Sequence, residues 1–330
     1  MPSGARGCDN HGKVSALILT ILIISLLVSL TLQFNRSMRS DVHAAANLRD
    51  GIKLGCIAKS GFNYSLAVLL GDASEGKVDS LHETWADPKT LSEISASLFN
   101  QGRFEAQVLD HSARIQINSL VNDQQPQQFV PAQRDILKRL LTQFNLEDEE
   151  AENIINAIKD WIDSDSTDTG EFSRAENAYY QGLERPYACK NAPMDFLEEL
   201  LLVRGITEEL FYGNEEMPGI ADFLSPVGDG MININTADPV VLKALSAEIT
   251  DEMVTNMLEY RDDEERDLSA INWNERVGVS DVPVENSLLA TSSTYFEIIS
   301  KGFKGAMARQ VTGMVKRTEQ EFEVLSWKIE

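Results

Sequence analysis

The stretch that decides the architecture of this chain is HGKVSALILTILIISLLVSLTLQFNR, residues 11–36. Its segment from Val14 to Asn35 carries no charged side chain and consists mostly of Leu, Ile and Val. A helix of about 20 apolar residues crosses a bilayer, so the run is long enough to span one. The residues after it contain no Ala-x-Ala-like cleavage site, which a secretory signal peptide would carry there. The run is therefore predicted to remain in the mature protein as a membrane anchor.

Positive charges flank this run on both sides, so they do not fix its orientation in the membrane. The remainder of the chain, residues 37–330, has the composition of a water-soluble domain. Long domains translocate largely regardless of their charge. The sequence therefore predicts a single-pass protein whose topology follows from the large domain after the anchor.

The chain as a whole is strongly acidic. Asp and Glu number 52 against 29 Lys and Arg, which gives a net charge of -23, and 43% of the 330 residues are hydrophobic. That apolar content can build one large core or two modest cores beyond the membrane segment. Nucleic-acid phosphate would be repelled over most of such a surface, whereas a divalent cation would be attracted. An acidic surface that serves solubility alone is the simpler alternative.

Three cysteines, Cys8, Cys56 and Cys189, are too few for a disulfide scaffold. If the segment before the anchor is removed after Gly12, Cys56 and Cys189 remain as the possible pair in an oxidising compartment. Because the sequence does not give their separation, this pairing stays open.

The pattern after the anchor predicts an α+β fold. Apolar and small residues continue at helical spacing, which indicates one long helix over residues 14–70, half in the membrane and half out. The alternation in residues 104–108 predicts a strand, and Ile115 with Ile117 predicts a second strand.

A helical and strongly acidic block follows, from about Pro131 to Leu289. Its segments include LEDEEAENIINAIKDWID, APMDFLEELLLVRG and ITDEMVTNMLEYRDDEE, in which apolar residues recur at i, i+3 and i+4. The end of the chain alternates again and predicts three strands. A helical block inserted between strands of one sheet explains this order, with the sheet packed on the amphipathic half of the first helix. Trp161 and Trp327 are predicted to lie in the core.

One loop of the helical block concentrates carboxylates. The stretch DWIDSDSTDTGEFSRAENAYY holds the acids Asp160, Asp163, Asp165, Asp168, Glu171 and Glu176. The carboxylates of such a cluster repel one another unless they are solvated or neutralised by a cation. Calcium is a suitable cation, because it prefers hard oxygen ligands. The stretch does not match the EF-hand template. Counted from Asp163, its sixth position is Asp168 where the template has Gly, and its twelfth is Arg174 where the template has Glu. On the residues alone, a calcium site and a solvated acidic loop both remain open.

Several motifs, taken in order, resemble those of the K-type minor pseudopilins of bacterial type II secretion systems. They are the Gly12 and apolar-helix start, DWIDSD at 160–165, AENAYY at 175–180, PYACKNAP at 186–193, EELLLVRGI at 198–206, ININTADPVVLKAL at 232–245 and the ending VLSWKIE. The resemblance covers nearly the whole chain. It implies a pilin-like fold, in which a long N-terminal helix packs on an antiparallel sheet, with a large all-α insertion.

The resemblance also implies a division of the chain. Residues 1–12 would form a prepilin leader and residues 13–70 the transmembrane pilin helix. Residues 71–120 would form the first part of the pilin β domain, residues 121–289 the inserted acidic helical domain, and residues 290–330 the C-terminal strands.

The same resemblance explains the start of the chain. In pilin-like proteins a prepilin peptidase cuts after the glycine before the apolar helix, here Gly12, and methylates the new N-terminus, here Lys13. Pilins usually carry a glutamate at the fifth mature position, where this chain has Leu17. The K-type proteins lack that glutamate, so the departure supports this subtype. A carboxylate in the bilayer costs energy unless it is paired, and a subunit at the tip has no neighbour above it to pair with.

Calcium is implied as well, because the family binds it in the inserted helical region. The predicted ligands, in order of their match to the family, are Asp163, Asp165 and Glu176, then Asn177, Asp168, Glu171 and Asn191. Asn177 stands where the family often has an Asp. The predicted ion is structural, since it would pin the irregular loop to neighbouring helices.

The function implied by the resemblance is assembly rather than catalysis. The protein would cap the tip of the type II secretion pseudopilus and support protein secretion across the outer membrane. It would span the cell inner membrane once, with its C-terminal domain in the periplasm. Its partners would be the I- and J-type minor pseudopilins, the prepilin peptidase and the inner-membrane platform of the secretion system.

Three alternatives are weighed against this prediction. The first is a minor pilin of a type IV pilus, with a tip or adhesion role. Gene neighbourhood would separate it from a pseudopilin, because only a pseudopilin gene should lie beside the genes of a secretion operon. Residues 233–261 resemble helix-hairpin-helix modules of DNA-binding proteins, but the hairpins VRGITEE and SAEITDE lack a glycine and place acids where phosphate would bind. An enzyme is disfavoured, because the sequence has no HExxH, P-loop or G-x-S-x-G motif, and no catalytic residue is predicted.

Overall fold

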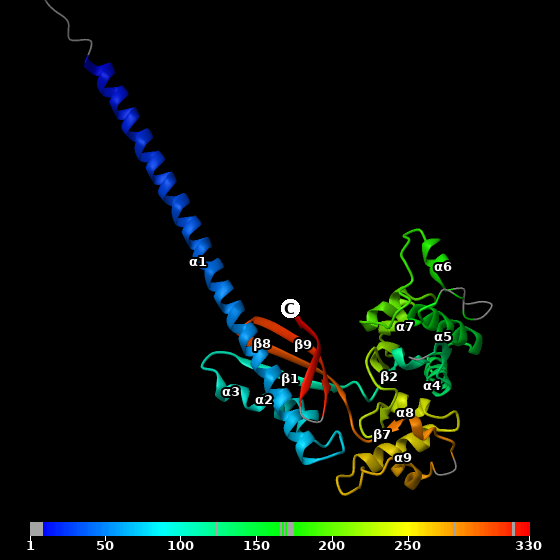
Figure 1. Ribbon diagram of the computed structural model, residues 1–330. Coiled ribbons are helices and arrows are strands. Elements are labelled where there is room, and N and C mark those ends of the chain that lie inside the picture. The colour runs from blue at the N-terminus through cyan, green and yellow to red at the C-terminus, as the bar shows by residue number, and fades with distance from the viewer. Residues whose placement is uncertain are drawn as a thin grey trace, which may run out of the picture.

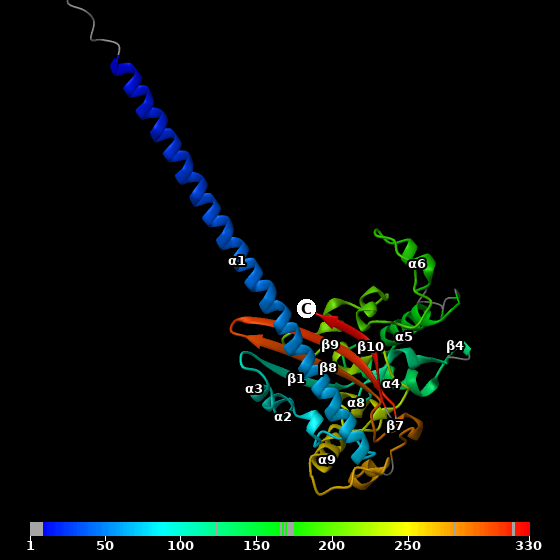
Figure 2. The ribbon, with the colours of Figure 1, turned by 60° about the vertical axis from the view of Figure 1, so that its left-hand side comes forward.

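The computed structural model describes residues 9–122, 125–165, 167, 169, 175–279, 282–318 and 321–330. The chain folds as one long helix, an antiparallel sheet packed against the second half of that helix, and a mostly helical unit beside the sheet (Figure 1). In the turned view the first half of the long helix again projects away from the rest of the chain (Figure 2). The predicted α+β class is therefore confirmed.

Helix α1, Asp9–Glu75, forms the spine of the molecule. Large apolar side chains along its first half are exposed, for instance Leu17 at 61% and Leu26 at 64%. Within the described residues it is the one helix long and apolar enough to cross a membrane, judged by length and composition. From Leu54 onward the helix buries one face, because its apolar residues there meet the sheet. The long helix predicted over residues 14–70 is confirmed.

Four antiparallel strands form the main sheet, in the order β1-β8-β9-β10. Their bounds are β1 Arg103–Asp110, β8 Tyr295–Lys304, β9 Met307–Arg317 and β10 Phe322–Ile329. The alternate residues Phe104, Ala106 and Val108 of β1 are buried in the core that α1 shares with the sheet, as their spacing predicts. The three strands predicted at the end of the chain are confirmed too. Because β1 pairs directly with β8, the helical unit is an insertion between two neighbouring strands.

Three short helices contact the free edge of β1, where the hydroxyls of Ser92 and Ser95 accept hydrogen bonds from its backbone amides. Further short helices build the helical unit. Those beside β1 are η1 Thr84–Ala86, α2 Pro88–Glu93 and α3 Ser95–Leu98. The helical unit itself has α4 Pro131–Thr142, α5 Asp148–Ile162, α6 Asn177–Gln181, α7 Glu208–Tyr212, α8 Pro239–Ala244 and α9 Asp251–Arg261. Its 3-10 helices are η2 Ile117–Leu120, η3 Leu197–Leu202, η4 Ile220–Phe223, η5 Trp273–Val277 and η6 Asn286–Leu288.

Small strand pairs tie the helical unit together around a core of its own. They are β2 Ile115–Gln116 with β5 Leu224–Ser225, β3 Val121–Asn122 with β4 Gln125–Phe129, and β6 Ile232–Asn233 with β7 Leu289–Ala290. This core is separate from the one between α1 and the main sheet, so the chain builds two cores.

The prediction of a second sheet strand through Ile115 and Ile117 is wrong. Strand β2 is two residues long and pairs in parallel with β5 inside the helical unit, and Ile117 begins η2. Both isoleucines are buried in the helical core. Two alternating apolar residues can be buried in either unit, so such a short run does not decide the sheet to which it belongs. Residues 113–120 pack with the helical unit, not with the first part of the sheet.

The two tryptophans predicted to lie in the core differ in their burial. Trp161 on α5 is 3% exposed, as predicted. Trp327 on β10 is 41% exposed, so the prediction for it is wrong. Strand β10 lies at the edge of the sheet, where Trp327 meets Phe62 of α1 edge-on, at a centroid distance of 4.6 Å, but is not enclosed.

Neither of the cysteines that could pair does so in the structure. Cys56 is exposed on α1, Cys189 is buried in the helical unit, and both are free thiols. Cys8 lies outside the described residues.

Candidate metal centre in the helical unit

Helix α5 delivers the acidic segment to the interior of the helical unit. Its acidic first turn, residues 148–150, suits the positive end of the helix dipole. An apolar stripe that includes Ile154 and Ile158 is buried and fixes the rotation of the helix. That rotation also buries Lys159 and Asp160 near its C-terminal end.

Three carboxylates meet just beyond the end of α5. Asp163, Asp165 and Glu176 each offer an oxygen, and these oxygens lie within 4.8 Å of one another. Asp163 is 0% exposed and Glu176 is 4% exposed. Glu176 is the N-cap of α6, so the chain returns after the acidic loop to close the cluster. The structure thus brings together the three residues that the sequence ranks first as ligands.

Four buried oxygens around this cluster have no hydrogen-bond partner in the part of the chain that the structure describes. They are Asp160 Oδ2, Asp163 Oδ1, Glu176 Oε1 and Asn191 Oδ1. Leaving a buried acceptor unsatisfied costs about 1–3 kcal/mol, and more when the group is charged. A set of hard oxygens is also what calcium takes as ligands. The residues present therefore fit a calcium ion.

Lys159 provides an ammonium group to this cluster. Its Nζ lies 2.7 Å from Asp163 Oδ2 and donates to Thr169 Oγ1 at 2.9 Å. Asp160 Oδ1 accepts a hydrogen bond from the backbone amide of Thr169 at 2.9 Å, which ties the loop back onto α5. One ammonium balances one carboxylate, so most of the negative charge of the cluster is left for another cation.

Burial raises the pKa of three carboxyl groups at this site. Loss of solvation raises the pKa of Glu176 to about 7, and repulsion from Asp160, Asp163 and Asp165 contributes to that rise. Burial also raises the pKa of Asp160 and of Asp163, while Lys159 opposes the change at both. A divalent ion would favour the charged form of these groups and reverse the shift.

The two asparagines among the predicted ligands are placed differently. Asn177 is exposed, and its Oδ1 accepts a hydrogen bond from the backbone amide of Cys189 at 3.2 Å. Its side chain therefore anchors the segment around Cys189. Asn191 has a left-handed backbone at φ 47° and donates its Nδ2 to the carbonyl of Asp165. Its unpaired Oδ1 makes Asn191 the better placed of the two.

Asp160 is a residue that the sequence alone does not rank among the ligands. It is 0% exposed, and its Oδ2 has no hydrogen-bond partner within the described ranges. Its position three residues before Asp163 is the signal that could have found it, because residues three apart lie on one side of a helix. Asp168 and Glu171 lie outside the described residues, so their roles stay predictions.

The predicted processing site lies near the start of α1. Gly12 and Lys13 fall within the helix that begins at Asp9, and Leu17 follows on its exposed apolar part. Cleavage after Gly12 and methylation of Lys13 stay predictions.

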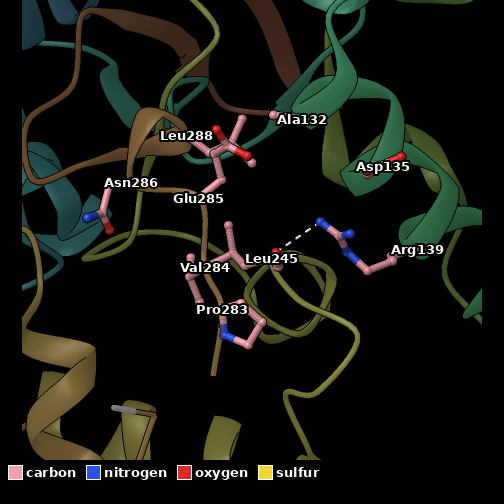
Figure 3. Close-up of a pocket in the computed structure, with 9 residues that line it drawn as sticks. All are labelled: Ala132, Asp135, Arg139, Leu245, Pro283, Val284, Glu285, Asn286 and Leu288. Carbon is pink, nitrogen blue, oxygen red and sulfur yellow. Dashed lines mark hydrogen bonds between the residues drawn. The ribbon is translucent and has the colours of Figure 1, made fainter. Parts of the chain in front are cut away.

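A surface pocket of about 420 Å³ lies beside the segment that resembles helix-hairpin-helix modules (Figure 3). The Arg139 guanidinium at its edge donates to the carbonyls of Ala244 at 2.5 Å and of Leu245 at 2.9 Å, which fastens α4 to the end of α8. Asp135 and Glu285 also line the pocket. This guanidinium serves packing, and the two carboxylates disfavour a phosphate.

Comparison with known proteins identifies relatives of this chain. The family model described as Type II secretion system (T2SS), protein K, matches residues 113–213, which include the carboxylate cluster. The type II secretion system protein K of Aeromonas hydrophila is 27% identical over 319 residues, which cover 90% of this chain and 89% of that protein. The protein of the same name from Pseudomonas aeruginosa is 24% identical, over 94% of this chain and 90% of that protein.

A solved structure is similar as well. It is a chain in the crystal structure of the GspK-GspI-GspJ complex from the enterotoxigenic Escherichia coli type 2 secretion system. The TM-score is 0.63 at 18% sequence identity, over 88% of this chain and 99% of that chain, so the two share a fold. The sequence relatives extend over almost the full length, and the family match falls on the helical unit that carries the candidate metal centre. Over most of its length the chain is therefore similar to the type II secretion system proteins K.

Proposed function

We propose that this protein is a minor pseudopilin that caps the tip of the type II secretion pseudopilus. The observation that carries the proposal is the exposed apolar first half of α1. Such a surface needs either lipid or the helices of other subunits around it. In the inner membrane α1 would anchor the chain by a single pass, with the folded part in the periplasm. In the pseudopilus the same surface would pack on neighbouring helices.

Two features support a position at the tip. The helical unit stands beside the sheet, at the end of the molecule away from the start of α1 (Figure 1). Its bulk would hinder another subunit from stacking above it. Leu17 occupies the fifth position after Gly12 and has no charge to neutralise, so it needs no terminus of a subunit above.

The partners follow from the same surface. The solved structure that shares this fold is, by its title, a complex of GspK, GspI and GspJ. We infer that I- and J-type minor pseudopilins contact the exposed part of α1. The prepilin peptidase would act at Gly12, and the inner-membrane platform would drive assembly. In this role the chain works as a structural component and carries out no reaction.

Calcium belongs to this proposal as a structural ion. Asp163, Asp165 and Glu176 would bind it, and the unpaired oxygens of Asp160 and Asn191 would complete the set. The ion would neutralise the carboxylates and join the end of α5 to the start of α6, which stabilises the folded helical unit by linkage.

Mass spectrometry of the N-terminal peptide tests the pseudopilin assignment. The protein extracted from membranes is expected to start at Lys13, with one added methyl group on its terminal amine. Pilin-type processing removes the leader and keeps the whole apolar run. A chain that starts at Met1, or that is cut beyond Leu32, would contradict the proposal.

Replacing Leu17 with glutamate tests the position at the tip. A carboxylate in the bilayer without a partner costs about 2.5–3.5 kcal/mol. Leu17→Glu is therefore expected to lower the amount of chain that co-purifies with the I- and J-type partners, and to reduce secretion. Leu17→Met, which stays apolar, is the matched control. If Leu17→Glu co-purifies and supports secretion like the control, the argument from this position fails.

A further inference from the structure

A second group of carboxylates lies where α1 ends. Asp72 near the end of that helix, and Asp79 and Glu83 in the segment after it, each offer an oxygen, and these oxygens lie within 4.8 Å of one another. Oxygens that bind one calcium ion stand roughly 2.3–2.6 Å from it, so two of them can be up to about 5 Å apart. The spacing therefore suits a shared cation.

Asp79 is the buried member of this group, at 1% exposure. Its Oδ2 accepts a hydrogen bond from the backbone amide of Ser293 at 2.6 Å and pairs with the Arg317 guanidinium. Its Oδ1 is buried and has no hydrogen-bond partner among the residues that the structure describes. A charged oxygen left unsatisfied in the interior is costly, so this atom points to a ligand that the protein does not supply.

Arg317 balances part of the charge. Its Nη1 lies 3.4 Å from Asp72 Oδ2, and its Nη2 pairs with Asp79 and donates to the carbonyl of Ser293 at 2.6 Å. Three ionised carboxylates and one guanidinium leave two negative charges, which is what a divalent cation cancels. Burial raises the pKa of Asp72 to about 6 and that of Glu83 to about 7, and repulsion between the carboxylates contributes to both shifts.

The group sits at the junction of the sheet and the helical unit. We call this junction, residues 72–83 and 290–294, the neck. The backbone amide of Asp79 donates to the carbonyl of Thr291 at 2.9 Å, and the carbonyl of Asp79 accepts from Asn233 Nδ2 at 3.1 Å. Asn233 belongs to the helical unit, so Asp79 touches both the inserted unit and the chain that leaves it.

We propose that Asp72, Asp79 and Glu83 bind a divalent cation, with calcium favoured by the all-oxygen ligands, and that the ion locks the neck. The ion would fasten the end of α1 to the loop that carries the helical unit. It would thereby fix how that unit is held on the spine of the molecule. This site is distinct from the metal centre between α5 and α6, with which it shares no residue.

Calcium bound per chain, measured by equilibrium dialysis of the full-length protein in detergent, tests the proposal. Glu83→Gln is expected to bind one calcium ion fewer than the wild type, because it removes one ligand charge and keeps an acceptor for the Trp85 indole N–H at 2.6 Å. Glu93→Gln, an exposed glutamate nearby on α2, makes the same charge change and is expected to bind as much calcium as the wild type. Glu176→Gln is expected to lose calcium from the other centre and to keep the neck ion.

The outcomes separate the two sites. If Glu83→Gln binds as much calcium as the wild type, the neck site is overturned, whatever happens at Glu176. If Glu176→Gln keeps all its calcium and Glu83→Gln loses one ion, the neck site stands and the other centre fails. If the wild type binds no calcium, both sites fail.

A second measurement covers the case in which Glu83→Gln does not keep the circular dichroism spectrum of the wild type. Trp85 contacts Glu83, so a terbium ion bound at the neck of Glu176→Gln would be excited through this indole. Terbium emission that calcium displaces, and that Trp85→Phe lowers at least twofold, is the expected result. Emission that Trp85→Phe leaves unchanged would overturn the proposal.

Discussion

Calcium is expected to raise the melting temperature of the full-length protein by about 5–11 °C when it is present a hundredfold above its Kd. An ion that binds the folded state alone adds about 2.7 kcal/mol to the free energy of unfolding at that concentration. Most of the rise should come from the centre between α5 and α6, where four buried oxygens have no hydrogen-bond partner among the described residues. Thermal unfolding in detergent, in calcium and in EGTA, measures the effect.

The variant Glu176→Gln is expected to lose most of this rise. A glutamine can still accept the hydrogen bond that Glu176 Oε2 receives from the backbone amide of Asn177 at 3.3 Å, so the cap of α6 is kept while one ligand charge is removed. Glu184→Gln makes the same charge change at an exposed position of the helical unit and should keep the rise. Equal melting temperatures of the wild type in calcium and in EGTA would contradict a structural ion.

The length of each periodic run decided how much of the fold could be predicted from the sequence. Helix α1, strand β1 and the three C-terminal strands are long enough for a helical or alternating pattern to be unambiguous. The run around Ile115 is too short for that. The helical spacing of the segment LEELLL does not settle the type of helix, because a spacing of three also fits a 3-10 repeat, and the segment forms the 3-10 helix η3. Alternation also does not distinguish an edge strand from a central one, which is why the predicted burial of Trp327 is wrong.

The candidate metal centre could be predicted only in part, because some of its residues are close in the sequence and others are brought together by folding. Asp163 and Asp165 are two residues apart in a recognisable motif, and Glu176 follows in the same acidic loop. Asp160 and Asn191 join them through the packing of α5 and the return of the chain, which no local pattern records. The neck carboxylates gave no signal, because they are scattered acids in a chain that has 52 of them.

Replacing Gly61 or Gly302 with alanine is expected to destabilise the contact between α1 and the sheet. A Cβ at Gly61 would contact Ser300 Oγ and lie 2.6 Å from a ring carbon of Phe104, and both neighbours are fully buried. A Cβ at Gly302 would lie 2.7 Å from the carbonyl oxygen of Leu54 in α1, where backbone must move. Overpacking of this kind costs about 1–3 kcal/mol, so the melting temperature should fall by several degrees.

Gly55→Ala is the matched control, because it makes the same substitution in the same helix. A Cβ at Gly55 meets no atom within 4 Å, so the higher helix propensity of alanine is expected to stabilise this variant by up to about 1 kcal/mol. The two helix variants, Gly55→Ala and Gly61→Ala, should therefore shift the melting temperature in opposite directions at a fixed calcium concentration. A higher melting temperature for Gly61→Ala as well would contradict this prediction. It would mean that Phe104 and Ser300 can move to accommodate the Cβ, and that α1 packs less closely on the sheet than the structure shows.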